Sequence, residues 1–290
     1  MASTESAYYI PHGTKWPILG SIGLALLVGG FANFLNDHPA GEAFMITGFL
    51  ALVIMLFGWF GTVINESEGG VYNSQVDLSF RWGMGWFIFS EVMFFAAFFG
   101  ALFYARIYSV PWLGGEGAGG LGNALANLWP NYQAVWPTNG PANVGGEFET
   151  MNAIGIPAIN TIILLSSGGT VTMAHWAILK GQRPQFVLWL LATVTLGFTF
   201  VGLQAYEYIH AFTELNLTLH SGVYGTTFFM LTGFHGLHVT IGAIMLTVML
   251  LRGMRGHFSE QHHFAFEAAA WYWHFVDVVW LGLFIFVYWL

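Results

Sequence analysis

Histidines and carboxylates recur inside strongly apolar stretches of this sequence, where they require a chemical explanation. The stretch EAAAWYWHFVDVVW, from Glu267 to Trp280, carries a glutamate, a histidine and an aspartate. Because a helix turns by about 100° per residue, these groups and one preceding histidine fall within a stripe about 80° wide. The residues of this stripe are His263, Glu267, His274 and Asp277.

A second pair of histidines lies earlier in the chain. The stretch FHGLH places His235 and His238 three residues apart, on one face of a helix. We expect this face to lie opposite the stripe, so that the six side chains form a buried polar network between two helices. Such a network could be a metal or haem site built from imidazoles, a proton relay, or a set of hydrogen bonds that fixes helix register.

The spacing of these residues disfavours a metal site. Bundle di-iron sites use Glu-x-x-His pairs, and neither Glu91 nor Glu267 has a histidine three residues later. Desaturase-like membrane enzymes use several histidine boxes, whereas only His262-His263 is a doublet here. A free-standing membrane metalloenzyme would have to depend on a mixed set from both faces, namely His235, His238, Glu267 and His274.

Glu91 is an isolated acid in the middle of the apolar stretch FIFSEVMFFAAFF. It lies about eleven residues into its segment, hence ~16 Å from the nearer end and close to the middle of a bilayer. A centred acid costs roughly 2.5 to 3.5 kcal/mol on insertion scales. We therefore expect Glu91 to be protonated or hydrogen-bonded and turned toward protein or bound lipid. A proton-linked or lipid-contacting site fits this position, and so does a neutral acid that satisfies a neighbouring helix.

The elements that must position these groups are transmembrane helices. The chain has 290 residues, of which 56% are hydrophobic and 8% are charged, far fewer charges than a soluble domain carries. About 20 apolar residues cross a bilayer as a helix, and seven segments meet that requirement. We predict one all-α membrane domain over residues 1–290 with spans at about 16–35, 42–64, 80–108, 158–179, 186–209, 226–251 and 264–290, and a long loop over 109–157.

Charge and cysteine usage exclude several functions and set the orientation. The absence of cysteine excludes disulfides and thiolate chemistry, and seven bases against 15 acids disfavour a nucleic-acid partner. The N-terminus lacks the pattern of a cleaved signal peptide. With the N-terminus cytoplasmic, six of the seven bases lie inside, which places the C-terminus in the periplasm. The six are Lys15, Arg81, Lys180, Arg183, Arg252 and Arg255, and Arg106 is the exception.

Several long motifs make the chain resemble subunit III of haem-copper cytochrome c oxidase, of the aa3 type found in bacteria. They are YIPHGTKWPILGS, RWGMGWFIFSEVMFF, WPTNGP, IPAINTIILLSSG, LQAYEY, GVYGTTFFMLTGFHGLHVTIG and HHFAFEAAAWYWHFVDVVWLGLFIFVYW. The resemblance covers nearly the whole chain. It implies seven transmembrane helices in two groups, the first two and then five, with a cleft that holds phospholipid.

The resemblance also implies an accessory function. It predicts no catalytic residue, metal or redox centre in this chain, with haem a, haem a3 and copper held by the catalytic subunit I and the copper-binding subunit II. The complex would pass electrons from cytochrome c to O₂ and pump protons within an aerobic respiratory chain. This chain would bind phospholipid, support proton uptake and stabilise subunit I. A related quinol oxidase is the alternative complex, and an autonomous transporter is disfavoured because no symmetry-related broken spans are visible.

Individual residues match positions to which the family gives a role. Glu91 matches an intramembrane glutamate that reacts with carbodiimides and lies beside lipid. The other lipid contacts that the resemblance implies are Trp59, Phe60, Arg81, Arg252, Arg255 and His257. Many members carry arginines where this chain has Gly61 and Asn65, which is a departure from the lipid head-group site. His12 is the one histidine available for the family's proton-collecting role near the N-terminus, and the bacterial inner membrane is the expected location.

Overall fold

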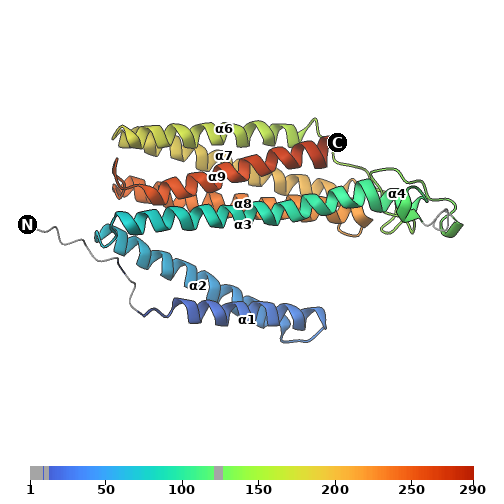
Figure 1. The fold of residues 1–290 in the computed structure, drawn as a ribbon, viewed down its shortest axis with the longest axis horizontal. Helices are drawn as coiled ribbons and strands as arrows, with labels where there is room; N and C mark the ends of the chain where they lie inside the picture. The colour runs from blue at the N-terminus through green and yellow to red at the C-terminus, as the bar shows by residue number, and fades with distance from the viewer. Residues whose placement is uncertain (1–8, 10–12, 121–126) are drawn as a thin grey trace, which may run out of the picture. The chain divides into compact units, whose positions relative to one another are not determined.

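The computed structural model describes residue 9, residues 13–120 and residues 127–290, and these residues fold entirely into helices and connecting segments (Figure 1). Seven helices within this part of the chain are long and apolar enough to cross a membrane. The predicted all-α membrane fold with seven spans is therefore confirmed. His12 lies outside the described residues, so its predicted role stays a prediction.

The helices follow the predicted order with short additional turns between the third and fourth spans. Their bounds are α1 (Trp16–Leu35), α2 (Gly41–Glu68), α3 (Ser74–Tyr104), η1 (Ala105–Ser109), α4 (Val110–Leu113), η2 (Ala118–Gly120), α6 (Ile156–Leu179), α7 (Arg183–Thr213), α8 (Gly222–Arg255), α9 (Phe264–Leu283) and η3 (Phe284–Trp289). Of the short elements, η1 and η3 are π-helical and η2 is a 3-10 turn.

Most helices are longer than the apolar segments that predicted them. The second helix continues to Glu68 and the third begins at Ser74, because polar residues at a helix end can face water while the backbone stays helical. The predicted start of the long loop at residue 109 is wrong, since the third span continues through η1 and α4 to Leu113. Pro111 cannot donate to the preceding turn, and the wide π turn of η1 comes directly before it.

The chain divides into two compact units, Met1–Trp82 and Gly83–Leu290. In the first, α1 and α2 pack as an antiparallel pair through small residues. A Cβ added at Gly30 would lie 2.5 Å from the backbone nitrogen of Met45, and one at Gly48 would meet the backbone of Leu27. Glycine at these positions therefore lets the two helix backbones approach closely, as membrane helices commonly do.

The second unit, which we call the five-helix unit, contains α3 from Gly83 onward together with α6, α7, α8 and α9. Its core is centred on Trp273 of α9, which is fully buried. A Cβ added at Gly197 of α7 would lie 2.7 Å from the Trp273 ring, and one at Gly242 of α8 would lie 2.9 Å from it. The indole donates to Ser167 of α6 at 2.9 Å. One side chain thus fixes the spacing of three neighbouring helices.

Residues 127–155, which precede α6, and the C-terminus lie at the same end of the five-helix unit, which we call the loop end (Figure 1). Phe148 of this connection stacks on Tyr224 of α8, with 5.4 Å between ring centroids. At the opposite end, the Arg183 guanidinium donates to the carbonyls of Gly253 and Met254. The Gly253 carbonyl also accepts from the Gly256 backbone amide, so Arg183 adds to the capping of the last turn of α8. The start of α7 is thereby held against the end of α8.

Candidate functional site

Glu91 of α3 forms a hydrogen bond with His238 of α8. The distance from Glu91 Oε2 to His238 Nε2 is 2.9 Å, and His238 Nδ1 lies 2.6 Å from the carbonyl oxygen of Phe234. A carbonyl can only accept, so Nδ1 carries a hydrogen. The proton between Nε2 and the carboxyl group then belongs either to a neutral glutamic acid or to an imidazolium. In both states the two residues share one proton. Glu91 is therefore hydrogen-bonded, which is one of the two states expected from the sequence.

Aromatic side chains surround this pair. The His238 ring lies 5.0 Å from the Phe95 ring and 5.8 Å from the Phe94 ring, and it stacks on Tyr272 at 6.4 Å. Side-chain exposure is 21% for Glu91 and 12% for His238. The pair is therefore largely shielded, and its charge-neutral arrangement suits an apolar surrounding.

His235 does not join His238, although the two lie on one helix face. Its Nε2 atom lies 3.2 Å from the carbonyl oxygen of Val276, and its ring packs at a tilt against Trp280, with 5.1 Å between ring centroids. The imidazole is completely buried. His235 thus connects α8 to the backbone of α9, whereas His238 turns toward α3.

His274 and Asp277 face α6 rather than α8. His274 Nδ1 lies 3.8 Å from Asp277 Oδ2, and His274 Nε2 lies 3.4 Å from the Thr172 hydroxyl. Asp277 packs directly on Gly168, where any side chain would clash with its carboxyl group. Both residues line a hollow of ≈ 630 Å³ between α6 and α9.

His263 and Glu267 lie at the start of α9. His263 Nδ1 lies 3.0 Å from the carbonyl oxygen of Ser259, and the ring meets His175 at 5.7 Å. The Glu267 backbone amide donates to the His263 carbonyl at 3.1 Å. The expected single network is therefore replaced by separate contacts to α3, α6 and the α8–α9 seam. The reason is that α9 packs on α6 as well as on α8, so one stripe meets several neighbours.

The residues expected to contact lipid lie in both units. In the first unit, Trp59 and Phe60 of α2 are exposed, and Arg81 pairs with Asp77 at 2.8 Å. In the second, Arg252 is buried with its guanidinium 4.7 Å from the Phe258 ring centroid, and Arg255 ends α8. The backbone amide of His257, just beyond, donates to the Arg252 carbonyl. A short basic segment therefore ends the helix at the side opposite the loop end.

Glu207 of α7 is a buried acid for which the sequence motifs predicted no site. Its Oε1 atom accepts a hydrogen bond of 2.5 Å from the Tyr288 hydroxyl, which also accepts from Gln204 Nε2 at 3.5 Å. Both α7 residues are buried. The signal was present in the stretch LQAYEY, where an amide and an acid three residues apart interrupt an apolar run.

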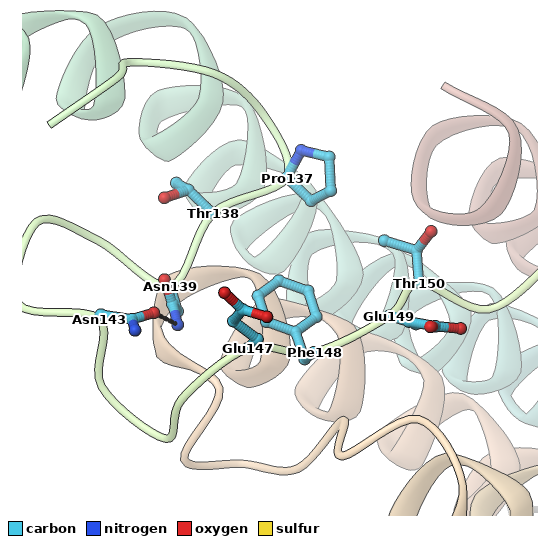
Figure 2. A pocket seen from close by; sticks show the side chains of 8 residues that line it. All are labelled: Pro137, Thr138, Asn139, Asn143, Glu147, Phe148, Glu149 and Thr150. Atoms are coloured by element: carbon cyan, nitrogen blue, oxygen red, sulfur yellow. Dashed lines mark hydrogen bonds between the residues drawn. The ribbon is translucent and has the colours of Figure 1, made fainter.

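Residues between 137 and 150 line a pocket of ≈ 650 Å³ (Figure 2). Asn139 and Asn143 point toward one another there, with Asn139 Nδ2 donating to Asn143 Oδ1 at 2.6 Å. The pocket also carries the carboxylates of Glu147 and Glu149, both on exposed residues. Across residue 9, residues 13–120 and residues 127–290, no three His, Cys, Asp or Glu side chains gather as a metal-ligand group.

Comparison with known proteins gives one consistent result. The chain matches the family model for cytochrome c oxidase subunit III over residues 6–122 and 124–290. It is 40% identical to cytochrome c oxidase subunit 3 of Carassius auratus and to that of Gadus morhua, and 39% identical to that of Pongo abelii. Each similarity covers 290 residues, which is 100% of this chain and 99% of the relative.

Proposed function

The chain belongs to the family of cytochrome c oxidase subunit III, and on that basis we propose that it is a non-catalytic accessory subunit of a proton-pumping oxidase. The oxidase passes electrons from cytochrome c to O₂, and this subunit stabilises the catalytic subunit. The observation that carries the proposal is similarity over the full length of both chains, since a shared fragment would leave the shared role open.

In this proposal the redox groups belong to other chains. Haem a, haem a3 and copper are held by the catalytic subunit I and the copper-binding subunit II. The positions of the histidines support this assignment against a free-standing metalloenzyme. His238 engages both ring nitrogens with Phe234 and Glu91, while His235 bonds to the backbone of α9 and His274 turns to α6. These imidazoles are directed to different helices rather than to one metal.

Phospholipid is the proposed small-molecule partner. Trp59 and Phe60 offer exposed apolar surface on α2, and Arg255 with His257 offers polar and basic groups at the end of α8. Acyl chains suit the first surface and a phosphate head group suits the second. An Arg255→Ala variant should lose bound phospholipid phosphorus from the purified complex, while Lys180→Ala should retain it; equal retention would contradict the assignment.

Support of proton uptake is the proposed contribution to turnover. His12 would collect protons near the N-terminus, and Glu91 with His238 would hold one proton inside the membrane. His12→Ala should slow steady-state proton uptake at high pH, where protons are scarce, and leave it unchanged at low pH. A rate that is equal at both pH values would contradict the role of His12.

We assign the complex to a respiratory membrane, with the bacterial inner membrane, the cytoplasmic N-terminus and the periplasmic C-terminus as predictions. The relatives named above come from animals. Quinol oxidation is the alternative activity of the complex.

An affinity tag on this chain provides the test. Mild detergent extraction and tag purification should recover haem a, copper and larger partner subunits in fixed ratio, with oxidation of reduced cytochrome c coupled to O₂ consumption. Recovery of the chain without haem would contradict the proposal. Oxidation of quinol but not of cytochrome c would replace the cytochrome c complex with the quinol complex.

A further inference from the structure

Polar atoms without hydrogen-bond partners gather in the loop-end half of the five-helix unit. Within the described part of the chain, four fully or almost fully buried side chains contribute five such atoms. These atoms are Nδ2 and Oδ1 of Asn160, Oε1 of Gln204, Oε2 of Glu207 and Nδ1 of His235. Buried polar groups in folded proteins are nearly always paired with protein or with an ordered water molecule, so this concentration points to a ligand.

The partners that are in place define the direction of the hydrogen bonds. Gln204 Nε2 donates to the Tyr288 hydroxyl at 3.5 Å, and the hydroxyl donates to Glu207 Oε1 at 2.5 Å. The other ends of the amide and of the carboxyl group, Gln204 Oε1 and Glu207 Oε2, have no partner. Because residues three apart share a helix face, both open atoms lie on the same side of α7.

Asn160 of α6 lies at about the depth of Gln204. The antiparallel helices α6 and α7 are held in register by a hydrogen bond of 2.8 Å between Thr170 and Thr193. Moving about ten residues toward the loop end along both helices brings Asn160 level with Leu203, the neighbour of Gln204. The amide of Asn160 is fully buried at that level and neither of its polar atoms is paired.

Aromatic rings border the cluster. Tyr288 lies 5.4 Å from the Phe228 ring and 5.8 Å from the Trp280 ring, and Trp280 meets Phe200 edge-on at 4.7 Å. Such surroundings disfavour an ionised carboxylate unless a cation accompanies it.

The titratable groups on the packed helices have other contacts. His210 of α7 pairs with Glu214 at 3.1 Å, the Tyr208 hydroxyl pairs with Thr232 of α8 at 2.7 Å, and His235 of α8 bonds to the Val276 carbonyl. The bonded partner of Glu207 is the Tyr288 hydroxyl.

We propose that Asn160, Gln204 and Glu207 form an internal site that binds water and holds a proton on Glu207. The protonated Oε2 atom donates to a bound water molecule, and the water donates to the carbonyl oxygens of Gln204 and Asn160. Such a water makes three hydrogen bonds, which is typical of buried water. It closes a ring from Gln204 through Tyr288 and Glu207 back to Gln204, and so ties the last turn of the chain, η3, to α7.

This site is separate from the Glu91–His238 pair. It involves α6, α7 and η3 rather than α3 and α8, and its acid is bonded to a phenol rather than to an imidazole. The proposal rests on the contacts of this chain alone, so it stands or falls independently of the proposed role in the oxidase.

Infrared spectroscopy of the purified, chain-containing complex tests the protonation state. The protonated carboxyl band should move to lower frequency in D₂O and should lose one component in Glu207→Gln. The matched control is Glu214→Gln, which removes an exposed acid from the end of the same helix and should leave that component unchanged. Tyr288→Phe should shift the component, because it removes the 2.5 Å hydrogen bond. A wild-type spectrum unchanged by Glu207→Gln would overturn the proposal.

A structure of the wild-type complex at a resolution that shows ordered water tests the ligand without any variant. The expected result is a density peak at about 2.7–3.2 Å from Glu207 Oε2 and Gln204 Oε1. A peak surrounded by six or more oxygens at about 2.4 Å would indicate a cation instead. The cation peak would overturn the proposed water site. A direct hydrogen bond between Glu207 and Gln204, with no density between them, would overturn it as well.

Discussion

Glu91 and His238 show how a membrane interior accommodates an acid. The two side chains come from positions 147 residues apart and meet at 2.9 Å. Their shared proton leaves the pair neutral overall, which avoids the cost of an isolated charge in an apolar medium. The pairing therefore primarily lowers the cost of placing Glu91 in an apolar surrounding. Any role of the pair in proton movement has to use the proton that the two side chains already share.

Removal of either Glu91 or His238 should destabilise the chain, because the remaining side chain loses its hydrogen-bond partner. Glu91→Ala leaves His238 Nε2 without its partner, and we expect a loss of about 1–3 kcal/mol in the stability of the chain within the complex. His238→Ala should cost a similar amount, and the double variant should cost less than the sum of the two, because the broken interaction is counted once. Thermal unfolding of the complex measures all three.

The same variants separate a structural role from a catalytic one. Complexes that carry Glu91→Ala should assemble and complete the first catalytic cycle, with shorter lifetime under turnover. A complete loss of the first cycle in an assembled complex would contradict the accessory role of this residue. Strictly additive losses in the double variant would contradict the paired arrangement.

At the scale of elements, the position of Trp273 between α7 and α8 depends on two glycines. Gly242→Ala should place a Cβ 2.9 Å from Trp273 and 3.2 Å from Tyr272, and overpacking of this kind costs about 1–3 kcal/mol. Gly236→Ala is the matched control on the same helix, because a Cβ there meets no atom within 4 Å. The control should be neutral or stabilising. Equal melting temperatures for the two variants would show that Gly242 is not a packing constraint.

The connection between α2 and α3 is held by a tyrosine pair. Tyr9 and Tyr72 donate to the two oxygens of Glu66 at 2.8 and 2.6 Å. Burial, followed by the hydrogen bond to Glu66, raises the pKa of Tyr72 above that of an ordinary tyrosine, and the bond to Glu66 raises the pKa of Tyr9. The neutral phenols are therefore the forms that favour the folded state.

This pair predicts a pH dependence with a definite sign. A raised folded-state pKa gives a contribution to stability that is complete below the ordinary tyrosine value of about 10 and is lost as pH rises through the folded value. The wild-type chain should therefore melt above Tyr72→Phe at neutral pH, and the difference should shrink above about pH 10. A difference that grows with pH would contradict this assignment.

Helix positions were predictable because about 20 apolar residues suffice to cross a bilayer, and the start of α1 at Trp16 and of α9 at Phe264 agree with that criterion. Helix ends were not, because hydropathy stops where polar residues begin, while α3 starts earlier at Ser74 and continues as a helix through Leu113. Hydropathy marks the part of a helix that lies in lipid. The backbone hydrogen bonds of the helix continue past that part into polar residues.

The polar side chains illustrate a second limit at the same scale. Periodicity placed His274 and Asp277 on one face of α9, and the structure keeps them together at 3.8 Å. Periodicity does not identify the helix that this face meets, which is α6 and not α8. The partner of Glu91 was unpredictable from spacing for the same reason, because it depends on the packing of α3 against α8.

At the scale of the whole molecule, we propose that the partner subunits hold the redox groups and that this chain is an accessory subunit. The family membership places it in cytochrome c oxidase, and His235, His238 and His274 are directed to α9, α3 and α6, respectively. The fold provides helix packing, a hydrogen-bonded pair of Glu91 and His238 and an internal polar cluster, all of which can support a catalytic neighbour.

The most direct test is the removal of this chain from the purified oxidase with detergent, followed by haem and copper analysis of both fractions and a single-turnover O₂ reduction assay. We predict that haem a, haem a3 and copper stay with the depleted complex, which still reduces O₂ in its first turnover and then inactivates faster than the intact complex. Haem or copper that leaves in stoichiometric amount with this chain, or a depleted complex that retains its metals and fails in the first turnover, would contradict the accessory function.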